Sequence, residues 1–207
     1  MVPIGLLVSG RGSNLESILD AVDGNYITKG KVNVVVSNKL GVRALEIARN
    51  HHVPTVVLDD KGLPKMDPEY DRKTIATLEA HGVTPKDGLV ALAGYFRILS
   101  PEFVDRYHNR IMNVHPALLP AFPGLDAQKR ALEHGVKISG ATIHFVAKEV
   151  DAGPIILQAH VPIRDDDTVD TLSGRILRQE HRLYPEAIRL FTEDQLRIEG
   201  RRVVLKT

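Results

Sequence analysis

Short runs of aliphatic and β-branched residues alternate, through the first half of the chain, with longer segments whose apolar residues recur every three or four positions. The short runs predict strands at residues 4–8, 32–36, 54–58, 88–92 and 111–115. The periodic segments predict helices at residues 15–22, 42–50, 70–81 and 101–107. Strands alternating with helices are typical of parallel sheets. We therefore predict an α/β fold with an open, doubly wound, mostly parallel sheet and helices on both faces.

The second half of the chain has a different pattern. Four further strands are predicted at residues 139–146, 154–163, 195–198 and 202–205, the last two forming a C-terminal hairpin. A long helix before the hairpin begins after the acidic run at residues 165–167, which we interpret as a solvated helix entry. Pro185 lies within this helix and predicts an interruption or a kink. No repeat or linker divides the sequence, so we expect residues 1–207 to form one domain.

The charge balance narrows the class of partner. Lys and Arg number 27 and Asp and Glu 26, a formal net charge of +1. Nucleic acids and membrane surfaces call for a basic excess, so we expect neither as a partner. The absence of cysteine excludes a thiolate metal site and a thiol nucleophile. The longest uncharged stretch is too short for a membrane span and no basic segment precedes the first apolar run, so we expect a cytoplasmic protein.

The first strand ends in the glycine-rich turn Ser9-Gly10-Arg11-Gly12-Ser13-Asn14, directly before a helix. Ser13, with Glu16 three residues later, predicts a capping box. Free backbone amides at such a helix start favour an anion, so we interpret Gly12, Ser13 and Asn14 as a phosphomonoester site. A tight turn without a ligand is the alternative.

The same turn is not a dinucleotide-binding fingerprint. Leu15 stands where the third glycine is required, and the second strand ends in Ser37-Asn38, without an acidic residue for a ribose. A phosphate-binding Walker loop is also absent, because no Gly-Lys-Ser/Thr follows. A nucleotide-dependent oxidoreductase is therefore disfavoured.

Two polar residues share one face of the strand at 111–115. The side-chain period of two places Asn113 and His115 together, at the carboxyl end where open α/β sheets bind ligands. An amide beside an imidazole can stabilise an oxyanion and move a proton. A hydrogen-bonded polar pair with only a structural role is the alternative. Nine histidines are present, but none has a metal-ligand spacing, so we expect no required metal.

The positions of two carboxylates also allow a purely structural interpretation. Asp151 precedes an apolar strand, where an aspartate most often bonds its own turn. Glu180 falls at the edge of the apolar stripe of the long helix, where it either reaches water or meets a polar ligand.

Taken together, five ordered motifs resemble the phosphoribosylglycinamide formyltransferase family, folate-dependent enzymes of purine synthesis, over nearly the whole chain. The motifs are Ser9-Gly10-Arg11-Gly12-Ser13-Asn14-Leu15, Ala93-Gly94-Tyr95-Phe96-Arg97-Ile98-Leu99, Asn113-Val114-His115-Pro116-Ala117-Leu118-Leu119-Pro120, Val150-Asp151-Ala152-Gly153-Pro154-Ile155-Ile156, and Gln179-Glu180-His181 with Tyr184-Pro185. The resemblance implies transfer of a formyl group from 10-formyltetrahydrofolate to the glycinamide amine of 5-phosphoribosylglycinamide. It implies a formyltransferase-like fold, with the phosphate site in the N-terminal half and the folate and catalytic site completed by the C-terminal half.

The resemblance also implies a role for each matching residue. Asn113, His115 and Asp151 would be catalytic, with Asp151 favouring a protonated His115. The substrate would be held by Gly12, Ser13, Asn14, Arg178, Gln179 and Glu180, the last of these bonding the ribose hydroxyls. The folate would be held by Phe96, Arg97, Ile98, Leu99, Asn113, Ala147, Lys148, Glu149, Val150 and Asp151. Small-molecule substrates are the implied partners, and the chain could act as a homodimer.

Two positions depart from the family pattern. Asp67 stands where some members have a folate-binding arginine, and Lys65 is the candidate to replace that contact. Leu177 stands where a polar residue often approaches the substrate. Methionyl-tRNA formyltransferase and formyltetrahydrofolate hydrolase share the chemistry but carry an additional domain, for which we expect no room in 207 residues. A non-catalytic sensor of a phosphorylated ribosyl ligand is the alternative from a different class.

Overall fold

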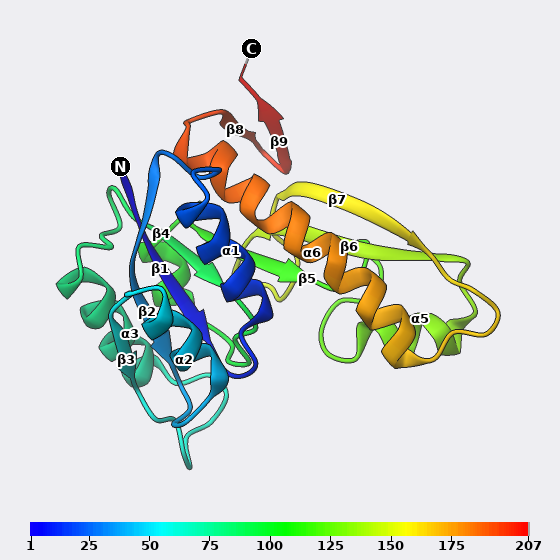
Figure 1. Ribbon diagram of the computed structural model, residues 1–207, viewed down its shortest axis with the longest axis horizontal. Coiled ribbons are helices and arrows are strands. Elements are labelled where there is room, and N and C mark those ends of the chain that lie inside the picture. Colours follow the sequence, from blue (N-terminus) through cyan, green and yellow to red (C-terminus); the bar gives the residue numbers. More distant parts are fainter. Residues whose placement is uncertain (207) are drawn as a thin grey trace.

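In the computed structural model, which describes residues 1–206, a nine-stranded sheet carries helices on both faces (Figure 1). The strands are β1 (Val2–Val8), β2 (Gly30–Ser37), β3 (Thr55–Val57), β4 (Leu89–Leu92), β5 (Ile111–His115), β6 (Ile138–Phe145), β7 (Ile155–Pro162), β8 (Leu196–Glu199) and β9 (Arg202–Leu205). The helices are α1 (Ser13–Asp23), α2 (Arg43–Asn50), α3 (Pro68–Ala80), α4 (Pro101–Arg106), α5 (Ala127–His134) and α6 (Val169–Thr192). Every predicted strand and helix is present, with bounds within about two residues of those expected.

The order of the strands confirms the doubly wound, mostly parallel sheet. It is β3-β2-β1-β4-β5-β6-β7-β9-β8, and β1 to β5 run parallel. From β6 onward antiparallel pairs predominate. Because β1 lies between β2 and β4, the carboxyl ends of β1 and β4 border the crevice where open sheets bind their ligands.

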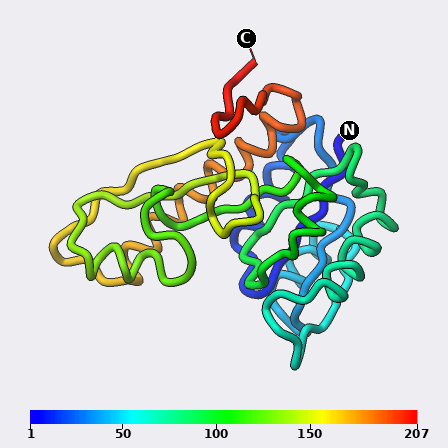
Figure 2. The backbone as a smooth tube through the Cα atoms, turned by 180° about the vertical axis from the view of Figure 1, so that it is seen from behind, coloured from blue at the N-terminus to red at the C-terminus, as the bar shows by residue number. Residues whose placement is uncertain are grey.

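Two apolar layers hold the helices against the sheet. Helices α1, α2 and α6 cover one face, where Leu15, Leu172 and Tyr184 are fully buried. Helices α3 and α4 cover the other, through residues such as Leu78 and Phe103. Both views show β6, β7, α5 and the first part of α6 projecting to one side of the parallel half (Figure 2).

The start of α1 differs from the predicted capping box. Gly12 is the residue before the helix and has a φ of 80°, so Ser13 is already the first helical residue and no side chain caps the helix. The amide of Glu16 donates instead to the Gly12 carbonyl over 2.8 Å. The prediction of a Ser13–Glu16 box was wrong because the left-handed glycine turns the chain into the helix one residue earlier.

The predicted interruption of the long helix at Pro185 is also wrong, since α6 continues from Val169 to Thr192. Leu183, Tyr184 and Pro185 are buried, so packing on the sheet keeps the helix continuous across the missing amide. The short helix α5 had no predicted counterpart, because it buries only two alanines and gives a weak periodic signal.

The acidic run before α6 is only partly solvated. Asp165 is exposed, as expected, with its side chain 95% accessible. Asp167 differs, because its side chain is 2% accessible and forms an ion pair with Arg175 two turns into the helix. This carboxylate therefore fixes the start of α6.

Candidate active site

The end of β5 carries the two polar side chains predicted on one strand face. Asn113 and His115 alternate along the strand with the buried Met112 and the half-buried Val114. The His115 side chain is buried beneath two loops. Its Nε2 lies 2.8 Å from the carbonyl oxygen of Phe122, in the loop after β5, and its Nδ1 lies 3.2 Å from Oδ2 of Asp151, in the loop after β6. Residues far apart in the sequence thus enclose one imidazole.

Asp151 is held in an unusual backbone conformation by several donors. Its φ is 53°, in the left-handed region. The amide of Gly124 donates to Oδ2 over 2.7 Å, and Nε2 of His144 lies 3.6 Å from Oδ1. Burial favours the neutral acid, but the bonds from His144 and Gly124 and the charge of His115 outweigh it and lower the pKa of Asp151 to about 2. The carboxylate is therefore ionised at neutral pH.

The resemblance implies a protonated His115, and two features of the site act on its protonation in opposite directions. Both ring nitrogens face acceptor oxygens, an arrangement that an imidazolium would satisfy. Burial nevertheless lowers the pKa of His115 below its ordinary value, against the opposing effects of Asp151 and the Phe122 carbonyl. In the unliganded protein burial therefore opposes the imidazolium that the two acceptor oxygens would satisfy.

Sequence analysis missed one member of this cluster, His144. It lies on β6 directly across from Asn113, with the Asn113 Nδ2 and His144 Nε2 atoms 3.5 Å apart. Its other ring nitrogen, Nδ1, is 2.8 Å from the carbonyl oxygen of Phe145. The signal for it was available only through the register of two strands, since nothing in the local sequence distinguishes His144 from the other histidines.

The glycine-rich turn meets the long helix at a second buried carboxylate. The Asn14 side chain donates from Nδ2 to Oε2 of Glu180 over 2.7 Å. Glu180 is 7% exposed, so the interpretation that it reaches water is wrong. Burial raises the pKa of Glu180, and the single bond from Asn14 only partly opposes this. A Cβ at Gly12 would lie 2.8 Å from the Ala44 backbone, so the turn packs tightly against α2.

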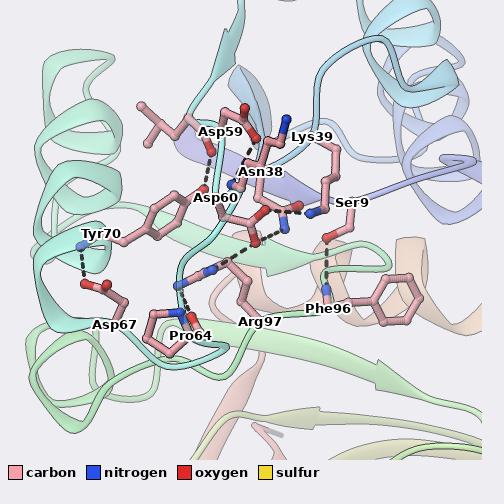
Figure 3. Close-up of polar contacts among 12 residues, drawn as sticks. Ser9, Asn38, Lys39, Asp59, Asp60, Pro64, Asp67, Tyr70, Phe96 and Arg97 are labelled. Atoms are coloured by element: carbon pink, nitrogen blue, oxygen red, sulfur yellow. Dashed lines mark hydrogen bonds and ion pairs between the residues drawn. The ribbon is translucent and has the colours of Figure 1, made fainter.

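Arg97 is buried in a polar cluster that joins the ends of several strands (Figure 3). Its guanidinium donates to Asp60 over 2.8 Å and to the Pro64 carbonyl over 3.0 Å, and it lies 4.0 Å from the centre of the Tyr70 ring. Burial favours neutral Asp60, but Lys39 and the other donors around it lower the pKa to about 2. The guanidinium therefore holds the loop between β3 and α3, which leaves little of it free for a ligand.

The other residues predicted at the folate site fall into exposed and buried groups. Phe96, Ile98 and Val150 have exposed apolar side chains. Leu99 belongs to the core beneath α3 and α4. In the loop after β6, Lys148 pairs with Asp105 of α4 over 2.8 Å, which anchors this loop to the parallel half.

The comparison with protein families decides the assignment. A family model described as "Formyl transferase" matches residues 3–188. The chain belongs to the formyl transferase family.

Relatives match nearly the whole length of this formyltransferase. Phosphoribosylglycinamide formyltransferase of Escherichia coli K12 is 42% identical over 94% of this chain and 89% of its own. The trifunctional purine biosynthetic protein adenosine-3 of Gallus gallus is 41% identical over 95% of this chain, which spans only 19% of that protein. Glycinamide ribonucleotide transformylase 1 of Symbiobacterium toebii has a similar structure, with a TM-score of 0.93, 49% identity and coverage of 100% and 95% of the two chains.

The positions that depart from the family pattern have distinct environments in this formyltransferase. Asp67 caps α3, accepting the Tyr70 amide over 2.9 Å. The Lys65 carbonyl accepts the amide of Ile98 over 3.1 Å, which brings Lys65 next to a predicted folate residue. Leu177 is half-buried on α6.

Two further predicted substrate residues lie on α6. Arg178 is exposed, and Gln179 accepts two bonds from Arg182 over 3.2 Å each. Among residues 1–206 no group of three or more suitable side chains could hold a metal. Within the same residues, no helix is long and apolar enough to cross a membrane.

Proposed function

We propose that this protein transfers the formyl group of 10-formyltetrahydrofolate to the amine of 5-phosphoribosylglycinamide, yielding formylglycinamide ribonucleotide and tetrahydrofolate in de novo purine synthesis. The observation that carries the proposal is the buried cluster of Asn113, His115 and Asp151. The names of relatives with about 40% identity over most of the chain support the same reaction.

The proposed substrate site joins the glycine-rich turn to α6. Gly12, Ser13 and Asn14 would bind the phosphate at the start of α1, where free amides and the helix dipole favour an anion. Glu180 would accept hydrogen bonds from the ribose hydroxyls, and Asn14 already orients it. The Oδ1 atom of Asn14 is buried and has no hydrogen-bond partner among residues 1–206, so an acceptor remains for the substrate. Arg178 and Gln179 would contribute from the exposed side of α6.

The proposed chemistry uses the neutral imidazole. The substrate amine attacks the formyl carbon, and the carbonyl electron pair moves to the oxygen. Asn113 donates to this oxyanion, while His115 accepts the amine proton and becomes an imidazolium that Asp151 stabilises. The intermediate collapses as the bond to folate N10 breaks, and the proton passes from His115 to that nitrogen. Nε2 must first leave the Phe122 carbonyl, so substrate binding displaces this contact.

The proposed folate site lies between two loops. The exposed side chains of Phe96, Ile98 and Val150 would cover the pterin, and the loop at residues 147–151 would close over it. Because Arg97 is occupied by Asp60, its contribution would come from its backbone, as would that of the buried Leu99. Lys65 would supply the positive charge that Asp67 cannot.

Other features of the assignment stay predictions. These are a single domain, a homodimer, a cytoplasmic location and the lack of nucleic-acid and membrane partners.

The experiment that tests the proposal follows tetrahydrofolate formation from 10-formyltetrahydrofolate, with phosphoribosylglycinamide present, absent, or replaced by initiator methionyl-tRNA. Rapid formation only with phosphoribosylglycinamide is expected. Formation without any acceptor would identify a hydrolase, and formation with the tRNA alone would identify a different formyltransferase.

A further inference from the structure

A cavity of about 420 Å³ lies beneath the C-terminal hairpin, between the end of α6 and the segment before β5. Its volume is within the range of sites for small ligands. The apolar part of its lining consists of Phe145, Phe191, Leu196 and Ile198. Phe191 is partly exposed there, with the Arg110 guanidinium 5.7 Å from the centre of its ring, so a planar group in the cavity would pack beside this pair.

The charged part of the lining has one sign. It consists of Arg110, Arg197 and Lys206, and within residues 1–206 no carboxylate lines this cavity. A neighbouring cavity of about 570 Å³ provides a comparison, because Asp87 and Asp194 balance its Lys29 and Arg110. Of these two cavities, the one beneath the hairpin therefore favours an anion.

Two of these basic groups can change partner at small cost. Lys206 pairs with Asp194 and Arg197 with Glu199, each over 2.7 Å, and all four side chains are at least 41% accessible. Exposed pairs of this kind contribute only about 0–1 kcal/mol. A phosphate inside the cavity would accept charge-assisted bonds from the same groups in a less solvated place.

The floor of the cavity is connected to the loop that carries Asp151. The amide of Phe145 donates to the Pro154 carbonyl over 2.9 Å. Gly153 lies so close to the Phe145 carbonyl that any Cβ would overlap it. From the hairpin, Arg201 donates to the Ala152 carbonyl over 3.3 Å. A ligand that fixes Phe145 and the hairpin would therefore restrict this loop.

We propose that the cavity beneath the hairpin binds a nucleoside monophosphate, with its base against Phe191 and its phosphate between Arg197 and Lys206, and that binding orders the Asp151 loop. The site is separate from the phosphate turn at Gly12, so its existence does not depend on the proposed reaction.

Calorimetric titration with adenosine 5′-monophosphate tests the site, with adenosine and inorganic phosphate as separate arms. We expect the nucleotide to bind more tightly than either part. The double variant Arg197→Glu/Lys206→Glu should weaken binding at least ~10-fold, as two lost charge-assisted bonds predict. A matched control, Lys129→Glu/Lys137→Glu, changes the net charge equally on α5 and before β6 and should bind normally.

Two further variants keep the result interpretable. Ser13→Asp repels phosphate at the glycine-rich turn and should leave this binding unchanged. Arg197→Gln/Lys206→Gln removes the charges without reversing them and should also weaken binding. It provides the test if the hairpin of the glutamate variant does not fold. Absence of binding to the parent, loss in Ser13→Asp, or normal affinity in both cavity variants would overturn the site.

Hydrogen exchange tests the connection to the loop. Saturating nucleotide should slow exchange of the amides at residues 146–153 in the parent and not in the cavity variants. Binding that leaves this exchange unchanged would contradict the ordering of the Asp151 loop.

Discussion

The two buried carboxylates, Asp151 and Glu180, have opposite electrostatic environments. Asp151 accepts from the Gly124 amide and lies beside His115 and His144, and its pKa falls to about 2. Glu180 has one donor, Asn14, and burial raises its pKa. Burial acts in the same direction at both sites, so the donors and the histidine charges around Asp151 make the difference. Asp151 is a permanently charged partner for an imidazole, whereas Glu180 still lacks the donors that a ribose would supply.

The strongest test of this difference concerns His115 and Asp151 as one unit. His115→Ala and Asp151→Asn should each lower turnover by ~10²–10³, the usual cost of losing electrostatic stabilisation of an oxyanion. Asparagine tolerates the left-handed backbone at 151, so the loop should keep its shape. The double variant should resemble the worse single one, because Asp151 acts through His115. Turnover at saturating substrates is the measurement, and multiplicative losses would contradict the coupled pair.

At the other carboxylate the effect should appear in substrate binding. Glu180→Ala should raise the KM for phosphoribosylglycinamide by roughly 10-fold, as expected for ~1.5–3 kcal/mol of charged hydrogen bonding. The KM for folate should change little. A matched control is Glu186→Ala, on the same helix, where the carboxylate pairs with Arg189 and Tyr26. An unchanged substrate KM in Glu180→Ala would remove Glu180 from the binding site.

Neutral substitutions of the two carboxylates should change the thermal stability in opposite directions. A depressed pKa means that Asp151 stabilises the fold above its ordinary pKa, and this contribution is lost as the pH falls towards 2. The raised pKa of Glu180 has the opposite consequence. Its neutral form stabilises the fold below its ordinary pKa, and this contribution is lost as the pH rises through its folded pKa. At pH 7 we therefore expect Asp151→Asn to lower Tm and Glu180→Gln to raise it by a few degrees, at ~2–4 °C per kcal/mol for a chain of this size. A change in Tm of the same sign in both variants would contradict this difference between the two carboxylates.

The same contrast shows what the sequence could predict. The fold followed from local periodicity, because each strand and helix of the parallel half buries its own apolar face. Asn113 and His115 were found because two residues on one strand share a face by geometry alone. The sequence does not predict the structural role of Arg97, because its partners Asp60 and Tyr70 come from a loop and from a helix that are distant in the chain.

The state of the site depended on contacts that no local pattern contains. The sequence leaves open whether Glu180 reaches water or a ligand, and the partner that its carboxylate has in the fold is Asn14, 166 positions away. His144 joined the site only through the antiparallel register of β5 and β6. The burial that lowers the pKa of His115 comes from two loops without regular structure. Pairing across the fold, more than residue identity, sets the electrostatics of both carboxylates.

The smallest expected effect is a shift in the acidic limb of the pH–rate profile. If neutral His115 accepts the amine proton, the rate should rise with pH through an apparent pKa below 6.5, because burial lowers the pKa of this imidazole. Asp151 opposes that shift by its negative charge. Removing the charge in Asp151→Asn should therefore move the limb to still lower pH, although the rate at every pH is lower.

Glu180→Gln should leave the limb of kcat in place, since this carboxylate does not face the imidazole. Measuring kcat from pH 5 to 8 at saturating substrates in these three proteins distinguishes the alternatives. A rate that instead falls as the pH rises through the pKa of His115 would mean that His115 works from its protonated form, in which case the charge of Asp151 serves to keep the imidazolium protonated.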